Sequence, residues 1–141
     1  MPKNHHSGFT LIEMLVVVAI IAVLVAIIIP TVTNATTKAK AATDAANLRS
    51  VLSEANAALV GSDVDVAVTT ANMTTFKCAS FPGANAYIYY VDPGFMVAYY
   101  SNGGSVYTVE SFAEAAASGN APAAASLPSG GTSYPVGGNG G

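Results

Sequence analysis

The sequence is poor in the residues that most enzymes and metal sites need. Its 141 residues include two histidines, one cysteine and no tryptophan. Both histidines, His5 and His6, precede a long apolar run. If this head is removed, no histidine is left for a Ser-His-Asp or Cys-His nucleophile, or for histidine-based zinc catalysis. We therefore expect no enzymatic activity, no metal site and no cofactor.

Charge is also scarce. Only 9% of the residues are charged, against about 25% in ordinary soluble domains. The formal net charge is −3, and the five Lys and Arg residues are spread along the chain. Nucleic-acid-binding proteins usually concentrate positive charge on one surface. The sequence therefore predicts no direct binding to nucleic acid.

The single cysteine, Cys78, cannot form a disulfide within the chain. A lone cysteine outside any metal-binding spacing is most often a small buried apolar residue. We expect that role for Cys78, with pairing between chains or reactivity as the alternative.

What the sequence does have is a long apolar run over residues 9–29. As a helix it would be about 31 Å long, close to the roughly 30 Å of a bilayer core. A single-pass anchor is one interpretation, and a secretory signal peptide with a small-residue site at Thr33-Asn34-Ala35 is another. The run is long for a signal peptide. Its flanking lysines, Lys3 before it and Lys38 and Lys40 after it, do not decide its orientation.

Glu13 distinguishes a third interpretation. A charged side chain within a membrane helix costs about 2.5–3.5 kcal/mol on insertion scales. A plain anchor gains nothing from that cost, whereas a helix that later packs against copies of itself can use the charge. Glu13 therefore favours a helix that leaves the bilayer and assembles.

The residues around Glu13 resemble the N-terminus of type IV pilins and pseudopilins. Gly8 and Phe9 precede Glu13, an apolar run follows, and Pro30 ends it; the matching stretch reads Gly8-Phe9-Thr10-Leu11-Ile12-Glu13. The resemblance implies that residues 1–8 are a leader. It implies that a prepilin peptidase cleaves between Gly8 and Phe9, and that Phe9 is then N-methylated.

The resemblance also implies partners and a location. The chain would be a single-pass precursor in the cytoplasmic membrane of a bacterium, with its N-terminus inside, and later part of an extracellular pilus built by an assembly platform and its ATPase. Glu13 of one subunit would meet the new amine of Phe9 in its neighbour, neutralising both charges. Pro30 would bend or locally melt the helix. Because a single cysteine cannot close the C-terminal disulfide loop of many Gram-negative pilins, a Gram-positive pilin or a pseudopilin fits better.

The expected fold class is α+β, the type IV pilin fold. Residues 9–30 would form the membrane and assembly helix, and residues 31–60 an amphipathic continuation, giving one helix of about 50 residues. A stripe at spacings of three and four would lie on a sheet: Ala45, Leu48, Leu52, Ala55 and Leu59. Residues 61–118 would be a small β headgroup.

Strand signals predict a three-stranded antiparallel meander over residues 86–91, 95–100 and 105–109. Its turns would be Asp92-Pro93-Gly94 and Asn102-Gly103-Gly104. Ser111 and Glu114 have the spacing of a capping box, which predicts a short helix over residues 111–117 that stops at Gly119. A further short strand is expected around residues 64–68.

Two other features have ordinary interpretations. Six of the seven tyrosines fall in the meander, where tyrosine is a common sheet residue, so an aromatic ladder with a function of its own is the weaker alternative. Residues 119–141 are rich in Ala, Gly, Pro and Ser and carry no charge. This composition predicts a mobile or loosely docked tail.

The leading functional hypothesis is a structural subunit of a type IV pilus. A pseudopilin of a type II secretion or competence DNA-uptake system is the alternative within the same architecture. A membrane-anchored binding module that never polymerises is the alternative of another class, and Glu13 argues against it.

Overall fold

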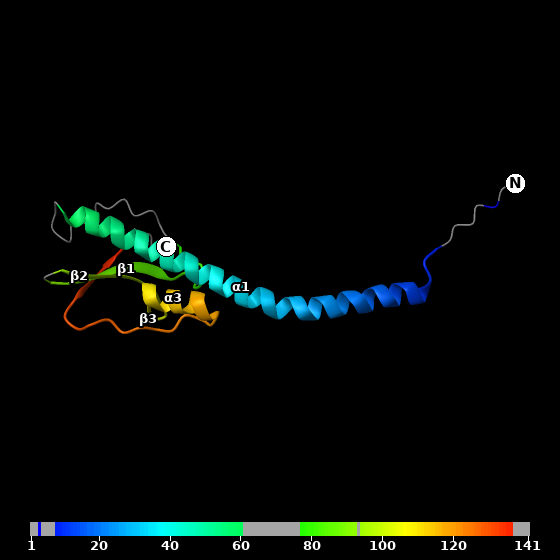
Figure 1. The fold of residues 1–141 in the computed structure, drawn as a ribbon. Helices are drawn as coiled ribbons and strands as arrows, with labels where there is room; N and C mark the ends of the chain where they lie inside the picture. The colour runs from blue at the N-terminus through cyan, green and yellow to red at the C-terminus, as the bar shows by residue number, and fades with distance from the viewer. Residues whose placement is uncertain (1–2, 4–7, 61–76, 93, 137–141) are drawn as a thin grey trace. The chain divides into compact units, whose positions relative to one another are not determined.

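The computed structural model describes residues 3, 8–60, 77–92 and 94–136. It contains a long N-terminal helix and a small four-stranded antiparallel sheet, the α+β layout that the sequence predicted and one consistent with the type IV pilin fold (Figure 1). The elements are α1 (Leu11–Leu59), β1 (Asn85–Val91), β2 (Phe95–Asn102), β3 (Ser105–Thr108), α3 (Val109–Ser118) and β4 (Thr132–Pro135). The chain divides into two compact units, Met1–Asn34 and Ala35–Gly141. The strand expected at residues 64–68 lies outside the described residues.

Helix α1 is a single element of 49 residues, which confirms the predicted length. Pro30 lies inside it, where it cannot donate a backbone hydrogen bond. The hydroxyls of Thr31 and Thr33 donate to the carbonyls of Ile28 and Ile29, at 2.7 and 3.0 Å. The helix therefore continues through Pro30 without a melted turn. The hydroxyls of the neighbouring threonines are hydrogen-bonded to the helix backbone. The bend at Pro30 stays a prediction.

Within the second unit, one face of α1 is buried against the sheet. The buried residues are Ala41, Asp44, Ala45, Leu48, Val51 and Ala55. Of the predicted stripe, Leu52 and Leu59 are only half-buried, and Val51 lies at the centre of the face instead. The face thus begins one turn earlier than predicted, at Ala41.

Asp44 is the one charged residue on this buried face, and no local sequence pattern predicts its burial. Its two carboxylate oxygens accept the backbone N–H groups of Ala79 and Ser80, at 2.6 and 2.8 Å. A buried carboxylate is tolerated when its oxygens are hydrogen-bonded in this way. Asp44 therefore fastens the segment that leads into β1 onto α1, beside the buried Cys78.

The predicted meander is present, and a fourth strand extends it. The strand order is β3-β2-β1-β4, with every neighbouring pair antiparallel. Gly103 and Gly104 connect β2 to β3 with φ of 57° and 84°. Two successive residues with positive φ make a type I′ hairpin turn, which matches the twist of the strands and selects glycine.

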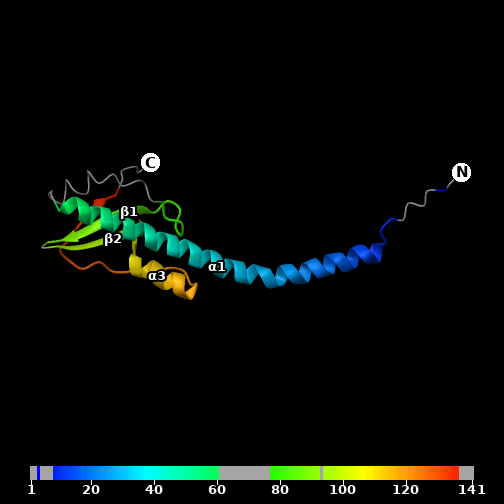
Figure 2. The same cartoon turned by 45° about the horizontal axis from the view of Figure 1, so that its top comes forward.

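The two faces of the sheet pack differently. Ala86 lies opposite Tyr100, and Ile88 opposite Ala98; all four belong to the core that α1 and α3 cover (Figure 2). On the other face, Tyr87 and Tyr99 are paired and stacked, with ring centroids 5.3 Å apart. The tyrosines thus fill ordinary packing positions on both faces.

Helix α3 begins earlier than predicted. Its N-cap is Thr108, and Ser111, the predicted cap, is the third helical residue. The Ser111 hydroxyl accepts the Thr108 N–H at 3.3 Å. The prediction was wrong by one turn because β3 runs directly into the helix. Gly119 ends α3 as predicted: its φ is 84°, and its N–H donates to the Ala115 carbonyl at 2.8 Å.

The prediction of a mobile or loosely docked tail is wrong for the described residues 120–136. Residues Thr132–Pro135 form β4 and pair with β1. The Tyr89 hydroxyl donates to the Pro128 carbonyl and accepts the Gly131 N–H at 2.8 Å. Composition misled here because it measures how much side-chain surface a segment can bury, whereas this segment is held by backbone hydrogen bonds and a tyrosine.

Candidate processing and assembly site

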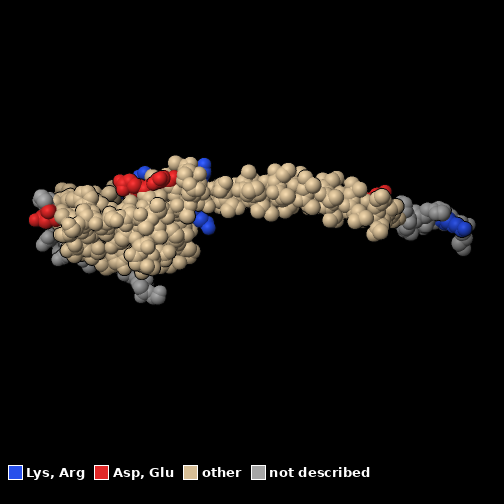
Figure 3. All heavy atoms as spheres, turned by 90° about the horizontal axis from the view of Figure 1, so that it is seen from below, with Lys and Arg blue, Asp and Glu red and all other residues tan. Residues whose placement is uncertain are grey.

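The first half of α1 is apolar on all sides. No residue from Met14 to Asn34 is charged, and every side chain of residues 11–34 is exposed. The large apolar side chains up to Val32 are 44–82% exposed. In Figure 3 this segment is tan along its length, with red only near Glu13.

Such a surface requires an apolar environment. Helix α1 is the helix in the described part of the chain that is long and apolar enough to cross a membrane, judged by length and composition. Its backbone groups are hydrogen-bonded within the helix, which is what a membrane span requires. Lipid or other apolar helices can both cover it, so the surface suits a membrane precursor and a helical assembly alike.

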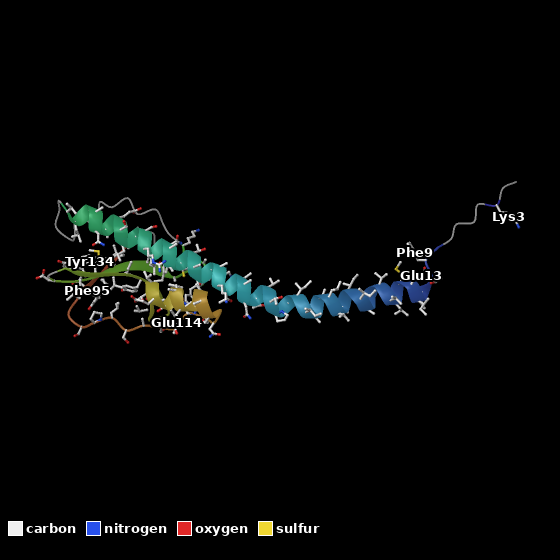
Figure 4. All side chains as sticks on the ribbon, in the orientation of Figure 1. Lys3, Phe9, Glu13, Phe95, Glu114 and Tyr134 are labelled. Atoms are coloured by element: carbon white, nitrogen blue, oxygen red, sulfur yellow. The ribbon has the colours of Figure 1, made fainter. Side chains whose placement is uncertain are left out.

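The residues before this helix leave the candidate cleavage point open. Gly8, Phe9 and Thr10 precede the first helical residue, and all three are exposed. Phe9 is 82% exposed, and a Cβ added at Gly8 would meet no atom within 4 Å. Figure 4 shows Phe9 and Glu13 at the start of the helix and Lys3 farther toward the N-terminus. A peptidase could therefore reach the Gly8–Phe9 bond without unwinding the helix.

Glu13 already has a partner in the uncleaved chain. The backbone N–H of Thr10 donates to its carboxylate at 3.0 Å, and the backbone N–H of Glu13 donates to the Thr10 hydroxyl at 3.4 Å. This reciprocal arrangement is a capping box, with Thr10 as the N-cap and Glu13 three residues later. The carboxylate also lies at the positive end of the helix dipole.

The capping box corrects an expectation from the sequence. Glu13 gains a partner before cleavage, because its carboxylate accepts a backbone N–H in the first turn of its own helix. The signal was present as Thr-x-x-Glu directly before an apolar run, the spacing that predicts a capped N-terminus. The cost of placing Glu13 in the membrane is therefore lower than the cost of an unpaired carboxylate.

The structure thus brings some predicted site residues together and keeps another apart. Gly8, Phe9, Thr10 and Glu13 form one continuous segment at the start of α1. Pro30 lies 17 residues beyond Glu13, roughly 26 Å along the helix, so it can act only on the shape of the helix. In the described residues, no group of three His, Cys, Asp or Glu side chains comes together as a metal site would need.

Comparison with known proteins supports the same segment. Residues 3–29 match the family model described as the prokaryotic N-terminal methylation motif, which is the class III signal peptide of type IV pilins. The chain therefore carries this motif, as its resemblance to type IV pilins predicted. Comparison with curated proteins and with solved structures gives no match.

Proposed function

We propose that this chain is a structural subunit of a type IV pilus. The observation that carries the proposal is a helix with an N-terminal methylation motif at its start, no buried side chain in its first half, and a folded unit built on its second half. The first half is ready for lipid or for other helices. A pilus subunit needs both environments, one after the other.

Processing changes the charge at the helix start. Hydrolysis of the Gly8–Phe9 bond leaves a carboxylate on Gly8 and a positive amine on Phe9, which N-methylation keeps positive. In a staggered bundle of parallel helices, Glu13 of one subunit pairs with this amine of the next. In an apolar bundle the pair compensates two charges that would each be costly alone.

The capping box shows what the Glu13 carboxylate binds before it can meet a neighbour's amine. Before cleavage the Glu13 carboxylate accepts the Thr10 N–H, so the precursor holds it in place at the first turn. After cleavage, the Phe9 amine offers a charged donor one residue before Thr10. In the cap only the acceptor is charged, whereas in a pair with a neighbour's amine both donor and acceptor are charged, so the amine can compete with the cap.

The partners follow from this role. The precursor lies in the cytoplasmic membrane, a prepilin peptidase cleaves it, an assembly platform with its ATPase lifts it out, and copies of the same chain receive it. The mature subunit is part of a filament at the cell surface.

Mass spectrometry of filaments sheared from the cell surface tests this proposal. We expect a mature chain that begins at methylated Phe9 and includes the Cys78 region. A chain that begins at Met1 or near Thr36 contradicts the processing step. A chain processed at Phe9 that stays in the membrane fraction, with no filaments recovered, contradicts the pilus role.

A further inference from the structure

The second unit exposes its large apolar side chains at one end. In its described part, these side chains are Val60, 88% exposed, and Phe95, 52% exposed. Val60 follows the C-terminal end of α1, and Phe95 follows the turn between β1 and β2; these two places lie at the same end of the unit in Figures 1 and 2. Asp92, also exposed, begins the same turn. We name Val60, Asp92 and Phe95 the hairpin pole.

The opposite end of the second unit is basic. Lys38 and Lys40 lie within the first turns of α1 that belong to this unit, and both are exposed. About 30 Å of helix separates them from Leu59, at 1.5 Å per residue. We name this pair the basic pole. Figure 3 shows blue atoms where α1 enters the unit, red atoms at the hairpin end, and a larger red patch between these two places.

We infer that the hairpin pole of one copy docks on the basic pole of a second copy, and this inference rests on the proposed function. The carboxylate of Asp92 is opposite in charge to Lys38 and Lys40, and such complementarity selects partner and register. The Phe95 ring can pack on the aliphatic stems of the lysines and face their ammonium groups. Within the described part of the chain, neither Asp92 nor the two lysines have an ion-pair partner.

The position of the two poles decides what kind of assembly they build. They are different surfaces at opposite ends of one unit, so their contact is head-to-tail and does not close on a dimer. A head-to-tail contact extends into an open filament, which agrees with the proposed function. A self-complementary dimer would instead need one surface that matches itself.

The contact also has a defined offset. For second units that lie parallel, opposite poles meet only if one unit is shifted by about 30 Å along its own part of α1. The contact is therefore staggered, and it joins each second unit to one farther along the filament.

Charge reversal in the full-length chain tests the contact. We expect Asp92→Lys, and separately Lys38→Glu with Lys40→Glu, to lower the yield of sheared filaments severalfold. Combining all three changes restores opposite charges and should restore most of the yield. Glu114→Lys makes the same charge change on an exposed residue of α3, away from the hairpin turn, and should leave the yield unchanged (Figure 4). Every variant should still begin at Phe9, because its N-terminal segment is intact.

Cysteine pairs give a direct readout. Filaments of a chain carrying Asp92→Cys and Lys40→Cys, treated with a mild oxidant that takes up the two thiol hydrogens, should yield a ladder of disulfide-linked multimers. Either change alone should give no ladder, since Cys78 is buried. Normal filaments without a ladder, together with full yield from the charge reversals, would overturn the inference. Absence of filaments from the unaltered chain would instead overturn the proposed function.

Discussion

The two halves of α1 share one backbone and have opposite surroundings. From Leu11 to Asn34 every side chain is exposed, and Glu13 is the one charged residue among them. From residue 35 to Leu59 the same helix buries one face against a sheet and presents Lys38, Lys40, Arg49 and Glu54 on the other. The second half packs against the sheet of its own unit, whereas no side chain of residues 11–34 is buried in the part of the chain that the structure describes.

This difference shows that the side-chain pattern, and not the secondary structure, decides what a helix binds. An α-helix satisfies its backbone internally, so it can stand in lipid, in a bundle or on a sheet. A one-sided apolar face fits a single partner, whereas an apolar surface all round needs cover on every side. Changes in the first half should therefore affect processing and assembly, and changes in the second half the stability of the second unit.

The largest effect is expected at the cleavage point. Gly8→Val should abolish processing and leave a chain eight residues too long, as measured by mass spectrometry of the membrane fraction. A Cβ at Gly8 meets no atom within 4 Å in the part of the chain that the structure describes, so we assign the loss to the peptidase, which must approach the backbone closely. Gly8→Ala is the matched milder change and should retain part of the cleavage. Normal processing of Gly8→Val would place the cleavage elsewhere.

The second prediction tests the charge of Glu13 and the Thr10–Glu13 cap separately. Glu13→Gln keeps an oxygen that can accept the Thr10 N–H but removes the charge, whereas Thr10→Val keeps the charge and removes the capping hydroxyl. We expect Glu13→Gln to be cleaved normally and to give almost no sheared filaments. Thr10→Val should lose about 1 kcal/mol of helix stability and still assemble. Equal filament yields from the two variants would mean that the cap, and not the charge pair, governs assembly.

In the second half, the largest effect is expected at Asp44. Asp44→Ala leaves the N–H groups of Ala79 and Ser80 without their acceptors, at roughly 1–3 kcal/mol for each unsatisfied donor. The free energy of unfolding of the second unit should fall by about 2–4 kcal/mol, measured in detergent by denaturant titration with tyrosine fluorescence. Glu54→Ala, an exposed carboxylate on the same helix, is the control and should change it by less than about 0.5 kcal/mol. An unchanged midpoint for Asp44→Ala would show that the segment before β1 is held by other contacts.

Sequence reasoning was most successful where one local pattern had one structural solution. The apolar run predicted the first part of a long helix, the Gly103–Gly104 pair predicted a hairpin, and Gly119 predicted a helix end. Each of these depends on neighbouring residues alone. The motif at Gly8 and Glu13 was equally local, and the family model covers it.

Sequence reasoning was less successful where a distant segment supplies the partner. No local pattern marks Asp44 as buried, because the two N–H groups that it binds come 35 and 36 residues later. Strand β4 was missed because Thr132–Pro135 is short and ends in proline, and only pairing with β1 makes it a strand. The Thr10–Glu13 cap is different, because its Thr-x-x-Glu spacing is a local signal that predicts a capped N-terminus.

Gly131 is the place to test whether the C-terminal segment belongs to the second unit. A Cβ at Gly131 would lie 2.6 Å from Cε1 of Tyr89, so Gly131→Ala must displace the ring or the segment. We expect a loss of about 1–3 kcal/mol and faster hydrogen exchange at the Val136 amide, which donates to the Ala86 carbonyl. Tyr89→Phe removes both hydroxyl contacts without a clash and should cost about 1 kcal/mol. If neither variant changes the exchange rate, β4 is held independently of Tyr89.

The smallest effect is expected from the ionisation of Cys78, and it tests the independence of the two halves. Burial, with the Asp44 charge nearby, raises the pKa of the Cys78 thiol from an ordinary value of 9.0 to about 11. The folded chain therefore holds its proton over a pH range in which the unfolded chain has lost it. This contribution to stability is complete below pH 9.0 and is lost as the pH rises toward 11.

The raised pKa of Cys78 also predicts slow alkylation, because a pKa rise of this size lowers the thiolate fraction at pH 8 about a hundredfold. Labelling with iodoacetamide, followed by mass spectrometry, should show Cys78 reacting far more slowly than in the denatured chain. Asp44→Ala should accelerate the reaction, because it loosens the segment that carries Cys78. Glu13→Gln should leave it unchanged, since the first half of α1 contributes no residue to the core around Cys78. A change in labelling with Glu13→Gln would show that the two halves are coupled through the helix that joins them.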